Sequence, residues 1–222
     1  MKIECFVFDF DGTLAELRLD FAAMKQQLNT LGGRYLACAP PEPFLPALEW
    51  VSYLEGEIGK RGGDPAGFRS EALALIGGME MEAAKSGALF PFTRPLLKML
   101  RAKGVKTAII TRNSEAAVRV VFPDLYEFCP TFLARDHVRS PKPDPAHAIY
   151  ALECVRAVPR EAIMIGDHPL DIQTGKAAGM WTGGVCSGSA TRCDLLAAGA
   201  DWVSDDCRKL IEELMREREK SE

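Results

Sequence analysis

Two aspartates separated by one residue, Asp9 and Asp11, follow an apolar run near the start of the chain. Carboxylates can bind a hard divalent cation, attack phosphorus as nucleophiles, or exchange protons with a reacting group. The run before them, residues 3–8, is rich in apolar and β-favouring side chains, which is typical of a strand buried on both faces of a parallel sheet. The pair is therefore predicted to lie at the carboxyl end of a buried strand.

Other polar residues follow later apolar runs in the same way. Thr111 follows the run at residues 106–110, and Asp167 comes shortly after the run at residues 162–165. Lys142 lies between two prolines, shortly before a predicted helix. Taken singly, each has an ordinary explanation as a helix cap, a turn former or a solvated lysine. Because ligands of open α/β sheets bind at the carboxyl ends of the strands, their joint occurrence there predicts one shared site.

The chemistry of that site follows from its charges. Several carboxylates in one cleft repel one another, and a bound cation offsets the repulsion. A hard divalent ion with oxygen ligands, most simply Mg²⁺, fits Asp9, Asp11 and Asp167. A cation, a lysine and a threonine hydroxyl together form a receptacle for a phosphoryl group. A carboxylate beside that group can attack phosphorus and form an aspartyl-phosphate.

The elements that must hold these residues alternate between strands and helices from residue 91 onward. After the first strand, further strands are predicted at residues 106–110, 131–133, 162–165, 181–185 and 202–203. Helical patterns separate most of them. This alternation predicts an α/β fold, a Rossmann-like parallel sheet with helices on both faces.

Residues 15–90 have a different texture, with three amphipathic stripes at helical spacing. Gly32–Gly33 is predicted to end the first helix, and Asp64–Pro65 to begin the third. Three such helices can bury their apolar stripes against one another. The sequence therefore predicts an α/β core made of 1–14 and 91–222, with a small all-α cap domain, 15–90, inserted after the first strand.

Composition excludes several classes of protein. The chain has 222 residues and a formal net charge of −4, with no basic stripe of the kind that binds nucleic acid. It has no apolar run of the ~20 residues needed to span a membrane, and no signal-peptide pattern, so a cytoplasmic location is expected. The seven cysteines form no C-x-x-C pair and are expected to be thiols rather than zinc ligands.

Four motifs that contain these residues occur in order along the chain. They are FDFDGTL at Phe8–Leu14, IITRN at Ile109–Asn113, SPKPDP around Lys142, and IGDHPLD, which contains Asp167 and Asp171. In this order they resemble the signatures of the haloacid dehalogenase-like superfamily. The inserted helices are similar, in position and texture, to the cap of its phosphoglycolate phosphatase-like branch.

The resemblance implies a role for each aspartate. Asp9 is the nucleophile, and Asp11 protonates the leaving oxygen and then deprotonates the attacking water. Asp9, the backbone carbonyl of Asp11, and Asp167 hold Mg²⁺. Asp171 orients Lys142 or a metal-bound water.

The resemblance also implies a phosphate-binding set. Thr111 and the backbone amide that follows it, within the segment Thr111, Arg112 and Asn113, bind the substrate phosphate. Lys142 neutralises charge on Asp9 and on the phosphoryl group. The relatives that cleave carbon–halogen or carbon–phosphorus bonds lack an aspartate at the position of Asp11, so its presence favours phosphate esters.

The predicted function is that of a phosphoric monoester hydrolase, an Mg²⁺-dependent phosphatase acting on a small phosphorylated metabolite such as phosphoglycolate. The main alternative is a sugar phosphomutase of the β-phosphoglucomutase type, which shares Asp9 and Asp11. A catalytically silent binding protein would have no need of all the site residues. A dinucleotide-binding oxidoreductase would need G-x-G-x-x-G after the first strand, where Asp-Gly-Thr stands instead. The oligomeric state is left open.

Substrate choice is expected to lie in the cap. Residues 15–18 depart from the D-S continuation of many relatives. Arg34, Lys60 and Arg61 lie where cap helices are predicted to meet, and one of them is a candidate for binding a substrate anion. The alternative is that they are exposed loop charges. His168, beside Asp167, is expected to be a solvent-edge residue of the turn.

Overall fold

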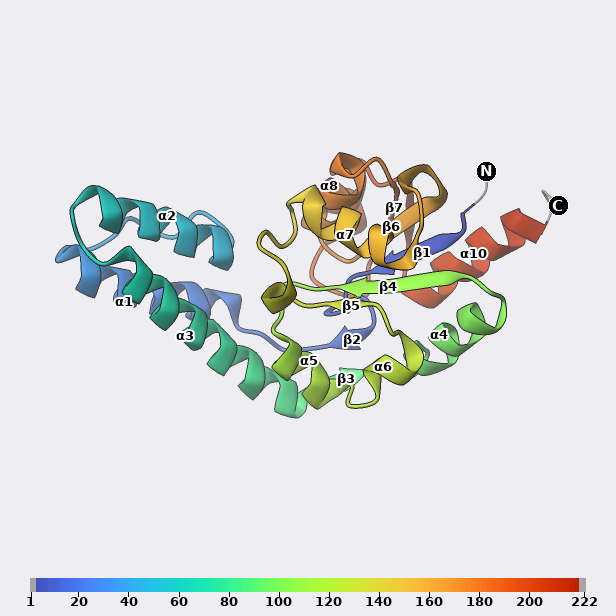
Figure 1. Ribbon diagram of the computed structural model, residues 1–222, viewed down its shortest axis with the longest axis horizontal. Coiled ribbons are helices and arrows are strands. Elements are labelled where there is room, and N and C mark those ends of the chain that lie inside the picture. Colours follow the sequence, from blue (N-terminus) through green and yellow to red (C-terminus); the bar gives the residue numbers. More distant parts are fainter. Residues whose placement is uncertain (1–2, 220–222) are drawn as a thin grey trace. The chain divides into compact units, whose positions relative to one another are not determined.

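The computed structural model describes residues 3–219, and the chain forms two compact units (Figure 1). One unit comprises Met1–Leu17 and Ser86–Glu222, and the other comprises Arg18–Lys85. These boundaries fall within a few residues of the predicted core and cap. The assignment of 15–90 as a domain in its own right stays a prediction.

A six-stranded parallel sheet forms the centre of the first unit. Its strands are β1 (Cys5–Phe8), β4 (Lys106–Ile110), β5 (Phe132–Leu133), β6 (Ala162–Gly166), β7 (Trp181–Val185) and β8 (Trp202–Ser204). Their order is β5-β4-β1-β6-β7-β8, so β1 lies between β4 and β6. The predicted Rossmann-like α/β fold is confirmed.

Helices cover both faces of this sheet, as Figure 1 shows. On one face, α7 (Pro145–Val155) and α8 (Pro169–Ala177) lie over alternate residues of β1, β4 and β6, including Val7, Ala108 and Met164. On the other face lie α4 (Thr93–Ala102) and α10 (Cys207–Glu219). Because both faces are covered, β1 has no exposed side chain, which explains its continuous apolar sequence.

Shorter elements complete this unit. They are α5 (Glu115–Val121), α6 (Leu125–Phe128), α9 (Arg192–Ala197), and the 3₁₀ turns η1 (Arg135–His137) and η2 (Pro159–Glu161). Side chains cap several helices. Ser114 accepts a hydrogen bond from the Ala117 amide at the start of α5, and Asp144 accepts one from the Ala146 amide at the start of α7. These caps fix where α5 and α7 begin, directly after the segments that carry the candidate site.

A two-stranded antiparallel ribbon joins the ends of the insertion within the same unit. Strand β2 (Ala15–Glu16) pairs with β3 (Ala88–Leu89). The Phe90 amide also donates to the Leu14 carbonyl at 3.0 Å. The sequence did not predict this ribbon, because strands of two residues are too short to have a period.

The second unit consists mainly of α1 (Phe21–Leu36), α2 (Ala47–Lys60) and most of α3 (Pro65–Ser86). Its core is apolar and consists of Met24, Leu28, Leu31, Leu36, Trp50, Val51, Leu54, Ile58, Phe68, Ala72 and Ile76. The Trp50 and Tyr53 rings stack on one another at 4.9 Å between centroids. This unit is thus an all-α module with a hydrophobic core of its own.

The first helix of this module does not end at Gly32–Gly33, as predicted, but continues to Leu36. The reason is tertiary packing. A Cβ atom at Gly32 would lie 2.8 Å from Cδ1 of the buried Leu54, so the missing side chain lets α1 approach α2 closely. The helix ends instead at Ala37, whose φ of 54° lies in the left-handed region.

Among the described residues, no helix is both long and apolar enough to cross a membrane. The seven cysteines are free, as expected. Cys5, Cys129 and Cys207 are buried, and burial raises the pKa of Cys5 to about 12 and that of Cys129 to about 11. These protonated thiols act as small apolar side chains.

Candidate active site

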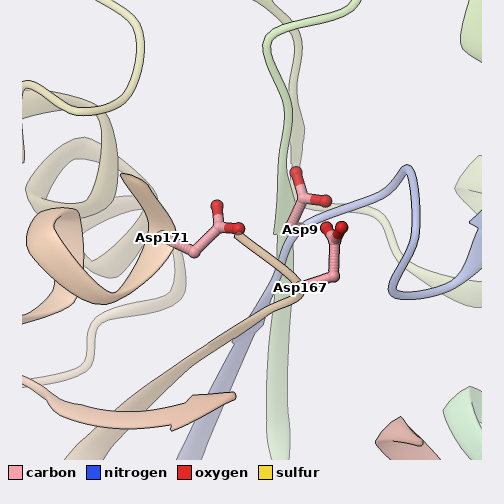
Figure 2. Close-up of side chains that lie close together, drawn as sticks. All are labelled: Asp9, Asp167 and Asp171. Carbon is pink, nitrogen blue, oxygen red and sulfur yellow. The ribbon is translucent and has the colours of Figure 1, made fainter. Parts of the chain in front are cut away.

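Three aspartates meet at the carboxyl ends of β1 and β6 (Figure 2). Asp9 follows β1, Asp167 follows β6, and Asp171 lies in the first turn of α8. One carboxylate oxygen from each lies within 4.8 Å of the others, and all three residues are buried. Adjacent parallel strands bring together residues that are far apart in the sequence, as expected for the edge where such sheets bind ligands.

Lys142 places a single positive charge between two of these aspartates. Its ammonium group donates to Oδ1 of Asp9 and, at 2.6 Å, to Oδ1 of Asp171. Only 2% of the lysine side chain is exposed. The second oxygen of Asp171 accepts the His168 amide at 3.1 Å, which fixes that carboxylate at the start of α8.

The proton affinities reflect this crowding. Burial, reinforced by Asp171 and Asp167, raises the pKa of Asp9 well above its usual value, although Lys142 opposes the change. Burial and Asp171 raise the pKa of Asp167 to about 6. Burial lowers the pKa of Lys142, but the Asp171 and Asp9 carboxylates outweigh it and hold that pKa above the ordinary value.

These residues fit a divalent cation. With all groups ionised, three buried carboxylates face one ammonium, so the group carries a net charge of −2. Buried charge of that kind is costly unless it is compensated, and oxygen donors at this spacing suit a hard ion. The group of three contains Asp171 rather than Asp11, which the sequence had assigned to the metal through its backbone carbonyl.

Asp11 lies beside this group and is half-buried. Its Oδ1 accepts the Leu17 amide at 2.9 Å. Burial raises the pKa of Asp11 to about 7, where a carboxyl can both give and take a proton near neutral pH. The turn after it needs a glycine, because Gly12 has a φ of +79° and a Cβ there would lie 2.4 Å from the Asp167 carboxyl carbon.

The predicted phosphate-binding segment follows β4. Thr111 is buried, and its Oγ1 accepts the Asn113 amide at 3.1 Å. The side-chain nitrogen of Asn113 is buried without a hydrogen-bond partner among the described residues. The Arg112 carbonyl accepts a guanidinium N–H of Arg135 at 2.8 Å, which holds the segment in place. An unpartnered donor in a buried segment beside a strand end is suited to bind an anion.

Sequence reasoning missed His147, which supports Lys142. The Lys142 amide donates to Nδ1 of His147 at 3.2 Å, so Nε2 carries the proton and donates to the Leu133 carbonyl at 3.1 Å. Burial, with a contribution from Lys142, lowers the pKa of His147 to about 4. A histidine in the apolar helix α7 gave no signal of this role beyond its proximity in sequence to Lys142.

The sequence also gave no indication of the loop after β7. The Ser189 amide donates to Oδ2 of Asp167 at 2.9 Å, and the Ser187 hydroxyl donates to the Gly12 carbonyl at 2.6 Å. The run Cys-Ser-Gly-Ser at residues 186–189 is typical of an ordinary turn. Its only distinguishing mark is a glycine between two serines.

The remaining candidate residues from the sequence are His168 and three cations of the helical unit. His168 caps α8, its Nδ1 accepting the Leu170 amide at 3.2 Å. In the helical unit, Arg34 lies 3.6 Å from Glu71 and Lys60 lies 2.7 Å from Glu57, both on the exposed surface. Arg61 donates to Sγ of Cys38 at 2.9 Å. Whether one of these cations binds a substrate anion stays a hypothesis.

Comparison with known proteins adds a family and several relatives. The model of the haloacid dehalogenase-like hydrolase family matches residues 3–179. A phosphoglycolate phosphatase from Psychrobacter arcticus is 28% identical over an alignment 235 positions long, and the alignment covers 97% of this chain and 97% of that protein. A phosphoglycolate phosphatase from Pseudomonas putida is 28% identical over an alignment 216 positions long, and the alignment covers 92% of this chain and 77% of that protein.

Solved structures share the fold. A hydrolase from Pseudomonas syringae superposes with a TM-score of 0.73 at 20% identity, covering 96% of this chain and 98% of that one. CbbY from Rhodobacter sphaeroides, solved in complex with phosphate, superposes with a TM-score of 0.61 at 24% identity, covering 94% and 96% of the two chains.

Proposed function

This chain belongs to the haloacid dehalogenase-like hydrolase family and is a phosphoric monoester hydrolase, and we propose that it works with Mg²⁺ through an aspartyl-phosphate formed on Asp9. The observation that carries this proposal is the buried group of Asp9, Asp167, Asp171 and Lys142 at the carboxyl ends of β1 and β6. A carboxylate fixed by a buried lysine, next to oxygens suited to a cation, is arranged for attack on phosphorus.

The cation would be held by Asp9, Asp167 and the backbone carbonyl of Asp11. When bound, Mg²⁺ supplies positive charge to the phosphoryl oxygens and offsets the excess of carboxylates. Lys142 also supplies positive charge. It binds one oxygen of Asp9, which orients that carboxylate and leaves its other oxygen for phosphorus. Asp171 holds Lys142 in this position.

The reaction proceeds in two displacements. Asp9 attacks phosphorus, an O–P bond forms, and the bond to the leaving oxygen breaks as Asp11 gives that oxygen a proton. A water molecule then attacks the phosphoryl group, Asp11 takes up its proton, and the bond between Asp9 and phosphorus breaks. The pKa of Asp11, raised to about 7 by burial, suits both proton transfers.

Donors from the segment after β4 would bind the phosphoryl oxygens. Thr111 can donate its hydroxyl hydrogen, because its Oγ1 is an acceptor towards the Asn113 amide. The buried side-chain nitrogen of Asn113 has no partner among the described residues and can donate in the same way. The backbone amide of Arg112 is proposed as a further donor, and Lys142 adds positive charge beside Asp9.

We propose a small phosphorylated metabolite as the substrate, and phosphoglycolate as the first one to test, because relatives covering most of this chain are phosphoglycolate phosphatases. The cytoplasm is proposed as its compartment, a placement supported by seven cysteines without a disulfide. The sugar phosphomutase stays as the alternative that the test below separates.

The test is phosphate release from a panel of phosphate monoesters, with Mg²⁺ or with a chelator, by wild type and Asp9→Asn. We expect wild type to release phosphate only with a divalent cation, and the variant to lose at least about 10⁴-fold in kcat. Metal-independent release, or an active Asp9→Asn, would contradict the proposal. Conversion of a sugar 1-phosphate to its 6-phosphate without free phosphate would favour the mutase.

A further inference from the structure

The loop after β7, residues 186–190, is here called the serine loop, and it encloses the Asp167 carboxylate. Both the amide and the hydroxyl of Ser189 donate to the same oxygen of Asp167, at 2.9 and 3.4 Å. Because both contacts reach Oδ2, the other oxygen of this carboxylate is left for a ligand. The serine loop lies beyond residues 3–179, the part of the chain that matches the family model.

The backbone packs closely against the Asp167 carboxylate at two glycines, Gly12 and Gly188, which lie in distant segments of the chain. A Cβ atom at Gly188, in the serine loop, would lie 2.0 Å from Oδ2 of Asp167, and one at Gly12 would lie 2.5 Å from the same oxygen. Real Cβ atoms do not approach an oxygen so closely, so only backbone can pack there. The carboxylate therefore has little freedom to rotate.

The serine loop also contacts the segment that carries the nucleophile. The Ser187 hydroxyl donates to the Gly12 carbonyl at 2.6 Å, across 175 residues of sequence. Gly12 directly follows Asp11 and lies three residues after Asp9. One short loop thus contacts both segments whose carboxylates would share the cation.

We propose that the serine loop is part of the cation site and that Ser187 and Ser189 are positioning residues for it. They set the orientation of Asp167 and its separation from the Asp9–Gly12 segment. Groups that orient metal ligands commonly change metal affinity or activity by about 10–100-fold when altered. The inference rests on the proposed function for its choice of Mg²⁺, but its geometry does not depend on which ester is hydrolysed.

The test is calorimetric titration of the substrate-free protein with Mg²⁺, for wild type, Gly188→Ala and Ser187→Ala. We expect Gly188→Ala to raise the Kd for Mg²⁺ about 10–100-fold, because the new methyl group displaces Asp167. Ser187→Ala, which loses one hydrogen bond, is expected to raise it on the order of fivefold.

Two matched controls come from the helical unit. A Cβ at Gly56 meets nothing within 4 Å, and the Ser52 hydroxyl donates to the Leu48 carbonyl at 3.2 Å on an exposed surface. Gly56→Ala and Ser52→Ala therefore make the same chemical changes in the other compact unit. Their Kd for Mg²⁺ is expected to stay within about twofold of wild type.

Two further measurements distinguish the possible results. Thermal melting in the presence of a chelator reports whether each variant folds, and phosphate release reports its activity. If Ser187→Ala melts like wild type and binds Mg²⁺ more weakly, and excess Mg²⁺ restores its kcat, the loop positions the cation site. If both loop variants fold and bind Mg²⁺ as tightly as the controls, the inference is overturned, even when wild type is an active phosphatase. Weaker Mg²⁺ binding in the variants of a protein that releases no phosphate would support the loop and refute the proposed function.

Discussion

The two units hold ion pairs of nearly equal length in opposite surroundings. In the core, the Lys142 ammonium lies 2.6 Å from Asp171, with 2% and 3% of the two side chains exposed. In the helical unit, Lys60 lies 2.7 Å from Glu57, with 74% and 26% exposed. Distance alone therefore says little about what a pair contributes.

The difference is one of solvation. Water and salt screen the Lys60–Glu57 pair, and either partner alone would simply be hydrated. Neither Lys142 nor Asp171 can be hydrated in place, so removing Lys142 leaves Asp171 as an uncompensated buried charge. The buried pair of the core lies at the candidate site, whereas the Lys60–Glu57 pair of the helical unit lies at the surface.

The largest expected effect is that of Lys142→Met. Without divalent cation, we expect this change to lower the free energy of unfolding by about 3–5 kcal/mol, because Asp9 and Asp171 lose the buried ammonium that contacts both of them. Phosphatase activity should fall at least about 10²-fold, because Asp9, the proposed nucleophile, loses its orientation. Urea unfolding and phosphate release measure the two effects.

Lys60→Met is the matched control, since it removes a lysine from an exposed pair of similar length. Its urea midpoint should be indistinguishable from that of wild type. An equal loss of stability in the two variants would contradict the contrast drawn between the units.

The second-largest predicted effect is a loss of stability at low pH, caused by the buried His147 of the core. The pKa of His147, lowered by burial to about 4 from its ordinary 6.5, is lower in the folded than in the unfolded chain. Stability from this group is therefore complete above pH 6.5 and is lost as the pH falls towards 4. Between pH 7.5 and 4, wild type should lose about 3 kcal/mol more than His147→Gln.

Chemical unfolding of both proteins across this pH range measures the difference. Carboxylates with raised pKa values, such as Asp9 and Asp167, oppose the trend, but both proteins carry them and they cancel in the comparison. The helical unit contains no histidine, so it offers no equivalent group. Parallel curves for the two proteins would refute the assignment to His147.

The smallest effect tests the packing of the helical unit. Gly32→Ala places a methyl group against the buried Leu54 and should destabilise the protein by about 1 kcal/mol, after allowing for the better helix propensity of alanine. Gly78→Ala, in open space on α3, should stabilise it by about 0.5–1 kcal/mol. Opposite shifts in melting temperature are expected, and shifts of the same sign would contradict this account.

The parts of the site that follow apolar strands could be predicted from the sequence. Asp9, Thr111 and Asp167 each come at or just after the carboxyl end of a buried strand, and parallel pairing brings those ends together. The helical insertion was equally visible, because its stripes repeat at helical spacing. Both patterns are local and periodic, so they can be recognised without knowledge of the fold.

The parts that depend on contacts between distant segments could not be predicted. Gly32 gives the signal of a helix end, yet the neighbour that overrides this signal, Leu54, lies on another helix. Ser187 contacts Gly12 across 175 residues, and nothing in the turn around it indicates that partner. His147 gave no sign of holding Lys142, because a histidine within an apolar helix has no pattern of its own.

The position of β1 in the sheet has a consequence for the order of folding. Cys5 pairs with Lys106 on one side and with Ala162 on the other, so the strand that leads to Asp9 is synthesised first and must wait for both neighbours. The segment Arg18–Lys85, which forms the helical unit, is synthesised well before either partner strand. Closing such long chain segments is slow compared with forming local contacts. The edge of the sheet that carries the candidate site is therefore expected to assemble among the last parts of the molecule, around a strand that is synthesised before its neighbours.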